Sequence, residues 1–351
     1  MFDKNRGCIL TADQQTSIEA RPITRAVGPK DAIVKISFCG ICGSDLHGWQ
    51  ANGAVYEFGT LMGHEATGTI EQVGSEVTKL KVGDRVAING FTPCRECVAC
   101  RNGLENACVN NMIRTIGQTS TLDGAFADYI WLPDVEITTV KMPDSLSMEE
   151  GAFTEPAATV VHAIRISQFK PGDTAAVVGA GPIGLLAASA LKAAGASKVI
   201  MSQRPGPRAD LALKFGADEL VNPRDDNHSV GEQIKEITDG GADVVIECAG
   251  APPAFQQSID LARPGGQVIL VGVNEKETPV IPTTLMFGEI SLRGSLAWNH
   301  KDFDIACQFM DSGQIDVKPL ISDIIELKDI QEKGFKRLKE DRNLIKILVK
   351  P

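Results

Sequence analysis

The sequence is poor in aromatic residues and has no excess of basic charge. Aromatic residues make up 5% of the 351 residues, so nothing indicates a platform for stacking nucleic-acid bases. Lysine and arginine number 35 against 45 aspartates and glutamates, which gives a formal net charge of −10. Nucleic acids and anionic membranes both favour basic patches, so we expect neither as a partner.

Long apolar runs are also scarce. The longest uncharged run, Thr174 to Leu191, reaches the length of a short membrane span, but three glycines and a proline lie at its centre. It divides instead into a strand, a turn and a helix, so we reject a membrane span. The first residues, MFDKNRGCIL, contain no long apolar stretch. We therefore expect no signal peptide and a location in the reducing cytoplasm.

The chain length predicts two domains. The first part contains short β-rich segments separated by glycine (32–40, 66–74 and 84–90), which predict an antiparallel, barrel-like domain. From about Phe153, short apolar strands alternate with helical segments rich in alanine and leucine. This alternation predicts a parallel sheet with helices on both faces. The last strand, 345–351, is expected to return to the first domain.

Four of the nine cysteines occur in one stretch, PCRECVACRNGLENAC. Cys94, Cys97, Cys100 and Cys108 have the close spacing with which four thiolates surround a tetrahedral zinc ion. Four thiolates leave no open position, so this zinc is expected to be structural and to order its loop. The alternative is a zinc ribbon that binds nucleic acid, but the acidic charge and the lack of a nearby basic run argue against it.

A glycine-rich turn follows the predicted strand at 174–178. Gly179, Gly181 and Gly184 fit the pattern G-x-G-x-x-G, with Pro182 and Ile183 between the last two. The first glycine permits the tight turn, the second lets the backbone approach a pyrophosphate, and the third allows close packing of helix on strand. Free N–H groups at the start of the helix would bind the phosphates. The alternative is a glycine turn without a ligand.

The end of the next predicted strand bears on the choice of nicotinamide cofactor. NAD-binding proteins place an acidic residue there, about 20 residues past the glycines. This chain has Ser202, Gln203 and Arg204, followed by Arg208. An arginine can pair with a 2′-phosphate, which a carboxylate would repel. We therefore expect NADP(H) rather than NAD(H); the alternative is that Arg204 is a solvated surface residue.

A second set of candidate metal ligands has a different chemistry. Cys42, His64, Glu65 and Glu155 offer the sulfur, nitrogen and oxygen atoms of a zinc site with an open position. Zinc lowers the pKa of bound water from ~16 to ~7 and would acidify a bound alcohol in the same way. A hydride could then leave for the nicotinamide, so the set predicts a catalytic zinc.

Residues just past Cys42 could move the proton. Ser44 could accept a hydrogen bond from the bound alcohol, and His47 could pass the proton to solvent, through a ribose hydroxyl of the cofactor. Asp45 would orient His64 through its other ring nitrogen, as metal-bound histidines usually require.

Five further residues have more than one interpretation. Cys39 begins a C-x-x-C pattern, for which a redox pair is conceivable, although packing as a small apolar residue is favoured. Trp49, Tyr56, Phe58 and Trp298 are candidate walls of a substrate pocket or, equally, core residues.

Together these motifs resemble the zinc-dependent medium-chain alcohol and polyol dehydrogenases over essentially the whole chain. The family signature GHE-x2-G-x5-G is formed here by Gly63, His64, Glu65, Gly68 and Gly74. The resemblance implies a mixed fold, α/β plus β-rich: a GroES-like, barrel-type catalytic zinc domain over 1–153 and 298–351. It also implies a Rossmann domain with a doubly wound parallel sheet over 154–297.

The resemblance also assigns roles to the site residues. It implies that Cys42 and His64 bind the catalytic zinc and that Ser44 and His47 form the proton relay. Glu155, in its Glu-Pro context, resembles the polyol and butanediol branch, where glutamate replaces the cysteine of liver-type enzymes. Glu65 is a neighbour of zinc and sometimes a ligand in the family, so either glutamate can complete the set.

The favoured function is an NADP(H)-dependent oxidoreductase for a secondary alcohol, vicinal diol or polyol, or the matching ketone. The alternatives are an NAD-dependent polyol or L-threonine dehydrogenase, a zinc-free quinone or enone reductase, and an inactive binding or structural member of the fold. The two ligand sets predict about two zinc ions per chain, which separates the zinc-free class from the others. The expected partners are a small-molecule substrate and further copies of the chain in a homodimer or homotetramer, as in relatives.

Overall fold

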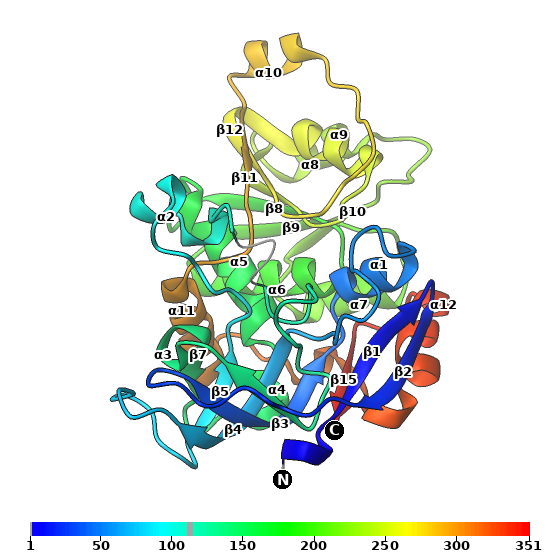
Figure 1. Cartoon of the computed structure of the whole chain (residues 1–351). Coiled ribbons are helices and arrows are strands. Elements are labelled where there is room, and N and C mark those ends of the chain that lie inside the picture. Colours follow the sequence, from blue (N-terminus) through cyan, green and yellow to red (C-terminus); the bar gives the residue numbers. More distant parts are fainter. Residues whose placement is uncertain (1, 111–114) are drawn as a thin grey trace. The chain divides into compact units, whose positions relative to one another are not determined.

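The computed structural model describes residues 2–110 and 115–351, which form two compact units (Figure 1). The first unit comprises Met1–Glu155, Asn299–Asp311 and Asp316–Pro351, and the second comprises Pro156–Trp298 and Ser312–Ile315. All nine cysteines are free. Within the described ranges, no helix combines the length and the apolar character needed to cross a bilayer.

The first unit contains nine strands in its described part: β1 (Arg6–Ala12), β2 (Gln15–Ala20), β3 (Ala32–Gly40), β4 (Glu65–Val73), β5 (Arg85–Ile88), β6 (Tyr129–Leu132), β7 (Thr139–Lys141), β14 (Ile321–Glu326) and β15 (Lys346–Lys350). Its short helices are η1 (Phe2–Lys4), α1 (Gly43–Gln50), α2 (Val98–Arg101), η2 (Glu105–Ala107), α3 (Val135–Thr138), α4 (Met148–Gly151), α11 (His300–Asp311), η4 (Lys318–Leu320), η5 (Leu327–Asp329), the π-helix η6 (Ile330–Lys336) and α12 (Arg337–Glu340).

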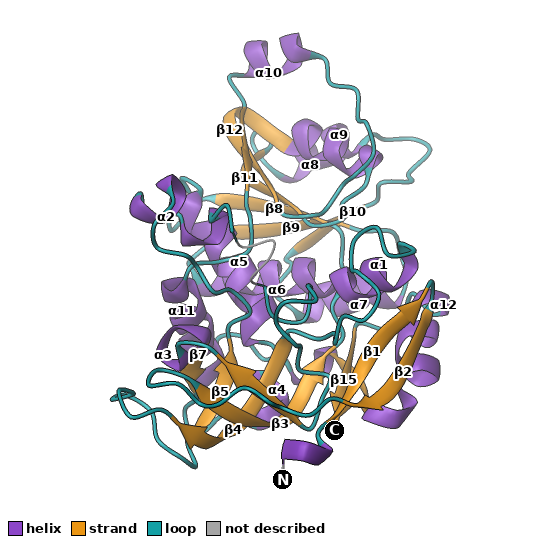
Figure 2. Cartoon of the chain, in the orientation of Figure 1, coloured by secondary structure: helices purple, strands orange, loops and turns teal. Residues whose placement is uncertain are grey.

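The main sheet of this unit has the order β14-β15-β3-β4-β5-β7, and β6 also pairs with β3. Figure 2 labels β15, β3, β4, β5 and β7 of this sheet. Most neighbours are antiparallel, as predicted. One pair departs from the prediction: β14 and β15 run parallel, since the helices η5, η6 and α12 connect them. The return of the C-terminal strand is confirmed, because Val349 of β15 pairs with Cys39 of β3.

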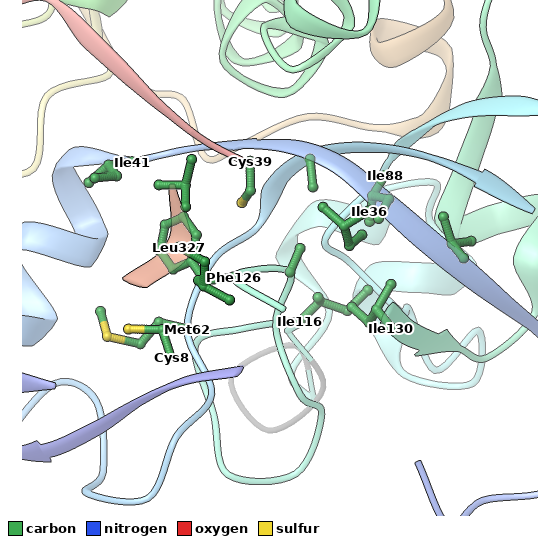
Figure 3. Packing of buried hydrophobic residues seen from close by; sticks show 14 of the residues in the cluster. Cys8, Ile36, Cys39, Ile41, Met62, Ile88, Ile116, Phe126, Ile130 and Leu327 are labelled. Carbon is green, nitrogen blue, oxygen red and sulfur yellow. The ribbon is translucent and has the colours of Figure 1, made fainter. Parts of the chain in front are cut away.

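Apolar side chains from these strands form one core, part of which is drawn in Figure 3. β-branched residues such as Ile36 and Ile88 fill it, as expected for strands that pack on one face. Cys39 is fully buried in this cluster, and its Sγ lies 3.8 Å from the carbonyl oxygen of Gly40. Cys39 therefore packs as a small apolar residue, which is the interpretation that the sequence favoured.

The second unit contains one six-stranded sheet with the order β10-β9-β8-β11-β12-β13, in which all the pairs are parallel. Its strands are β8 (Thr174–Val178), β9 (Lys198–Ser202), β10 (Glu219–Val221), β11 (Ala242–Glu247), β12 (Ala262–Leu270) and β13 (Ser291–Gly294). Its helices are α6 (Pro182–Ala193), α7 (Pro207–Lys214), α8 (Val230–Ile237), α9 (Pro252–Leu261) and α10 (Pro282–Gly288), together with most of α5 (Thr154–Ile166).

The predicted parallel sheet is therefore confirmed. β10 was not predicted, because three residues of mixed polarity carry no periodic signal. The strand order reverses between β8 and β11, since the chain proceeds outward from β8 through β9 to β10 and from β11 through β12 to β13. In open sheets of this type, the crevice at such a reversal is where ligands bind, at the carboxyl ends of the strands.

Candidate active site

The start of helix α1 is fixed by its own residues. The N–H of Cys42 donates to Oδ2 of Asp45 at 3.0 Å, which closes a capping box at the helix N-terminus. Asp45 is fully buried, and its other oxygen, Oδ1, lies 3.4 Å from Nδ1 of His64. Asp45 thus couples the loop that carries Cys42 to the imidazole, in the orienting position that the sequence predicted.

The Nε2 atom of His64 is the point on which the other polar groups converge. It lies 3.2 Å from Oγ of Ser44, 3.5 Å from Nε2 of Gln118 and 3.8 Å from Oε1 of Glu155. Cys42, the N-cap of α1, is only partly buried. Gln118 was not identified from the sequence, since a lone glutamine in a loop carries no motif.

Electrostatic effects within this group are large because Asp45, His64 and Glu155 are buried. Burial lowers the pKa of His64, but Asp45 and Cys42 raise it by more, so the net pKa lies well above its ordinary value. Burial raises the pKa of Glu155 to about 8, with Glu65 adding to the rise and His64 opposing it. A thiol, an imidazole and a carboxyl are donor types that suit a zinc ion, but the ligand atoms of Cys42, His64 and Glu155 do not all lie within 4.8 Å of one another.

The two candidate glutamate ligands have different surroundings. Glu65 accepts from Nζ of Lys346 through both oxygens, at 2.7 and 2.6 Å, and Lys346 also donates to the carbonyl oxygen of Ile41 at 3.1 Å. The side chains of this ion pair are only 1% and 4% exposed. Lys346 thus neutralises Glu65, whereas Glu155 faces His64. The sequence did not reveal Lys346, because β15 is buried on both faces and gives no alternation to mark it.

Replacing Lys346 with methionine is expected to destabilise the first unit by about 3–5 kcal/mol, because Glu65 would remain as a buried, uncompensated charge. The midpoint of urea unfolding measures the change. Lys350 lies on the same strand but is exposed, so Lys350→Met is the matched control and should change stability little. Combining Lys346→Met with Glu65→Gln should recover most of the lost stability. If Lys346→Met and Lys350→Met lose the same stability, the ion-pair explanation is contradicted.

His47, the second predicted relay residue, and the four candidate walls of the substrate pocket differ in their burial. His47 is half-buried on α1. Trp49 is a core residue whose ring stacks on Phe335 of η6, with 5.5 Å between the centroids. Tyr56 is also buried in the core, whereas Phe58 is 47% exposed. Trp298, the fourth candidate wall, is buried and belongs to the second unit.

The four cysteines of the predicted structural zinc site lie close together. The ligand atoms of Cys94, Cys97, Cys100 and Cys108 all lie within 4.8 Å of one another, which no other group of three or more such residues achieves in the described chain. Backbone N–H groups of Cys100 and Val109 lower the pKa of Cys97 to about 6. Thiols gathered in this way and held by backbone donors fit a tetrahedral zinc ion.

The glycine-rich turn has the geometry expected for binding phosphate. Gly179 has a φ of +95°, which favours glycine, and a Cβ at Gly184 would lie 1.8 Å from the carbonyl oxygen of Gly179. Gly181 is the N-cap of α6. A Cβ added to Gly181 would have no heavy atom within 4 Å, so the space beside this residue is open. Pro182 occupies the first turn, followed by Ile183, and needs no hydrogen bond there. The turn therefore fits a dinucleotide.

The residues after β9 lie beside this turn. Ser202 is buried and donates to Oε1 of Gln257 at 3.2 Å. Gln203 accepts from the N–H of Ala180 at 3.1 Å, so its side chain bridges the strand end and the glycine turn, which the sequence did not predict. Arg204 is exposed and Arg208 is half-buried on α7.

The fold and the two donor sets together define a zinc-binding dehydrogenase. Residues 28–144 match the alcohol dehydrogenase GroES-like domain family, and residues 182–312 match the zinc-binding dehydrogenase family. The chain therefore belongs to the zinc-dependent medium-chain alcohol and polyol dehydrogenases, as its sequence predicted. The predicted combination of a GroES-like domain with a Rossmann-type parallel sheet is confirmed.

Relatives cover nearly the whole chain. The protein named probable D-xylulose reductase A from Aspergillus clavatus is 36% identical over 97% of this chain and 95% of its own length. Among solved structures, 2R,3R-butanediol dehydrogenase from Bacillus subtilis is 30% identical with a TM-score of 0.89, and 99% of each chain is covered. A protein from Sinorhizobium meliloti 1021, solved bound to NADP, is 31% identical with a TM-score of 0.88 and the same coverage.

The chain is thus a zinc-type alcohol or polyol dehydrogenase that uses zinc and a nicotinamide cofactor and acts on a small molecule.

Proposed function

We propose that this enzyme transfers a hydride between NADP(H) and a secondary alcohol, vicinal diol or polyol, or the corresponding ketone. The observation that carries the proposal is the approach of Ser44 Oγ and Glu155 Oε1 to His64 Nε2, at 3.2 and 3.8 Å, which places a hydroxyl suited to proton transfer beside two candidate zinc ligands. The relatives named for butanediol and xylulose support substrates with neighbouring oxygen atoms.

We propose that Cys42, His64 and Glu155 hold the catalytic zinc. The ion pair with Lys346 supports Glu155 over Glu65, because a carboxylate bound through both oxygens to a lysine is a poor metal ligand. Cys94, Cys97, Cys100 and Cys108 would hold the structural zinc. When bound, the catalytic zinc supplies a Lewis acid and the nicotinamide a hydride acceptor.

The chain's own residues would then manage orientation and the proton. Asp45, whose Oδ1 lies 3.4 Å from Nδ1, would orient the His64 ring, and Nε2 lies near Ser44 and Glu155. Ser44 Oγ would accept a hydrogen bond from the substrate hydroxyl and would give up its own proton as it takes that of the substrate. The half-buried position of His47 supports its role in passing that proton to solvent.

The choice of NADP(H) is supported by the residues after β9, where no carboxylate follows Ser202 directly and two arginines stand nearby. Arg204→Ala combined with Arg208→Ala is expected to raise KM for NADPH about tenfold or more while changing KM for NADH little, because a charged hydrogen bond to the 2′-phosphate is lost. Steady-state kinetics with both cofactors measures this. Arg224, an exposed arginine of the same unit, is the matched control. A clear preference of the parent enzyme for NADH would contradict the assignment.

One spectrophotometric screen at the nicotinamide band tests the function as a whole. Secondary alcohols, vicinal diols, sugar alcohols and threonine are combined with NADP and NAD, with and without a chelator. We expect NADP-dependent turnover of diols or polyols, loss of that turnover with the chelator, and about two zinc ions per chain. Turnover of threonine or a sugar alcohol with NAD would favour the NAD-dependent alternative. Activity without metal would indicate a zinc-free reductase, and no turnover of any alcohol an inactive member of the fold.

We also propose a homodimer or homotetramer and a cytoplasmic location. Apolar side chains are strongly exposed around the edge of the second unit's sheet, including Val273 at 74%, Ile281 at 67% and Phe287 at 83%, and a second copy would cover them. Nine free cysteines suit a reducing compartment. Light scattering of the purified protein measures the oligomeric state.

A further inference from the structure

Strand β11 ends at the reversal of the six-stranded sheet, next to the glycine-rich turn. Its last residue, Glu247, pairs in register with Val178 of β8, directly before Gly179. The segment that follows β11 reaches the turn itself, because a Cβ at Gly179 would lie 3.0 Å from Cβ of Ala249. The position of residues 248–250 therefore determines one side of the space beside the glycine turn.

The carboxyl group of Glu247 holds this segment in place. Oε1 accepts from the N–H of Ala249 at 2.7 Å and from the N–H of Gly250 at 2.9 Å. The side chain is nearly sealed from solvent, with 3% of the residue exposed. On its other side it packs on the backbone after β12, where a Cβ at Gly272 would lie 2.7 Å from Oε2.

The backbone of Glu247 ties down the same region. Its carbonyl oxygen accepts from the N–H groups of Val271 and Gly272, both at 2.9 Å. One residue thus connects the ends of β11 and β12 and shapes the turn between β11 and α9. Burial raises the pKa of this carboxyl, while the N–H donors of Gly250 and Ala249 oppose the rise.

We propose that Glu247 is a positioning residue for the dinucleotide: through Ala249 and Gly250 it holds the segment after β11 against the glycine turn, so that the cofactor meets a preformed surface. The inference rests on the proposed binding of NADP(H) at that turn. Without the carboxyl group, the two N–H groups lose their acceptor and the segment can leave the position that contacts Gly179.

The test compares two carboxylates on one strand. Asp243, near the opposite end of β11, accepts from the N–H of Thr174 at 2.8 Å and pairs with Arg263 at 2.6 Å, away from the glycine turn. We expect Glu247→Ala to raise Kd for NADPH about tenfold or more, because two hydrogen bonds are lost. Glu247→Gln should stay within about twofold of the parent, since its amide oxygen still accepts. Asp243→Ala should lower Tm without raising Kd.

NADPH fluorescence titration, Tm and zinc content are measured for the three variants and the parent. Unchanged Kd in Glu247→Ala would overturn the inference while leaving the proposed function intact. Equal increases of Kd in Glu247→Ala and Asp243→Ala would also overturn it, because they would show a general effect of lower stability. If the parent binds neither NADPH nor NADH, the proposed function fails and the inference fails with it.

Discussion

Replacement of Cys42 by serine is expected to reduce kcat/KM for alcohol oxidation by about 10³-fold or more, because a metal ion contributes several kcal/mol of transition-state stabilisation. Cys42 lies at the start of α1, and Nε2 of His64 lies 3.2 Å from the hydroxyl of Ser44 on the same helix. Loss of the thiolate removes the soft ligand of this set and weakens zinc binding there. The zinc content should fall from about two ions per chain to about one.

Cys39 provides the matched control for this experiment. It lies three residues before Cys42 on β3 and is fully buried, but it packs in the apolar core. Cys39→Ala should lower stability by a small amount through the lost packing and leave both zinc ions and kcat/KM nearly unchanged. If Cys42→Ser oxidises alcohols as fast as Cys39→Ala, the assignment of the catalytic zinc is wrong. Equal inactivation of both variants would instead favour a redox pair.

Replacement of Cys97 by serine is expected to release the other zinc ion and to unfold its loop. Apolar side chains of this loop face solvent, with Val98 at 61%, Leu104 at 48% and Val109 at 67% exposed, so no core of its own holds it. Structural zinc contributes about 10–16 kcal/mol to the folding of small zinc peptides at neutral pH. We therefore expect cleavage within residues 91–110 to accelerate about 100-fold or more in limited proteolysis.

Val98→Ser is the control for the loop, because Val98 lies between the ligands and is exposed. It should retain about two zinc ions per chain and the parental rate of cleavage. Zinc retained at the parental level in Cys97→Ser would contradict a four-thiolate site. Loss of both zinc ions from that variant would show that the two metal sites are coupled, which the separate donor sets do not predict.

The sequence was most informative where a function requires particular residues at fixed spacing. Four thiolates at short spacing can reach one ion within a single loop, so Cys94 to Cys108 predicted a cluster that the structure assembles. The turn from Gly179 to Gly184 was equally clear, because steric contact with the carbonyl oxygen of Gly179 leaves no room for a side chain at Gly184.

The sequence was least informative where partners are distant in the chain. Lys346 lies 281 residues from Glu65 and resembles any lysine that interrupts an apolar strand. Gln118 and Gln203 reach their partners through side chains in loops, which no periodic pattern describes. Helix α1 was also missed, because its eight residues follow no apolar period and its N-terminus depends on a capping box that a cysteine begins.

The sequence by itself indicated the chemistry available to this protein: two sets of candidate metal ligands, a glycine-rich turn suited to a dinucleotide and a sheet of parallel strands. It could do so because spacing, glycine and hydrophobic period are local properties of the chain. Only the tertiary structure decided which glutamate is neutralised and which faces His64, because a buried charge is compensated by whatever the fold brings beside it. It likewise revealed the position of Glu247 at the end of β11, on which its proposed role depends.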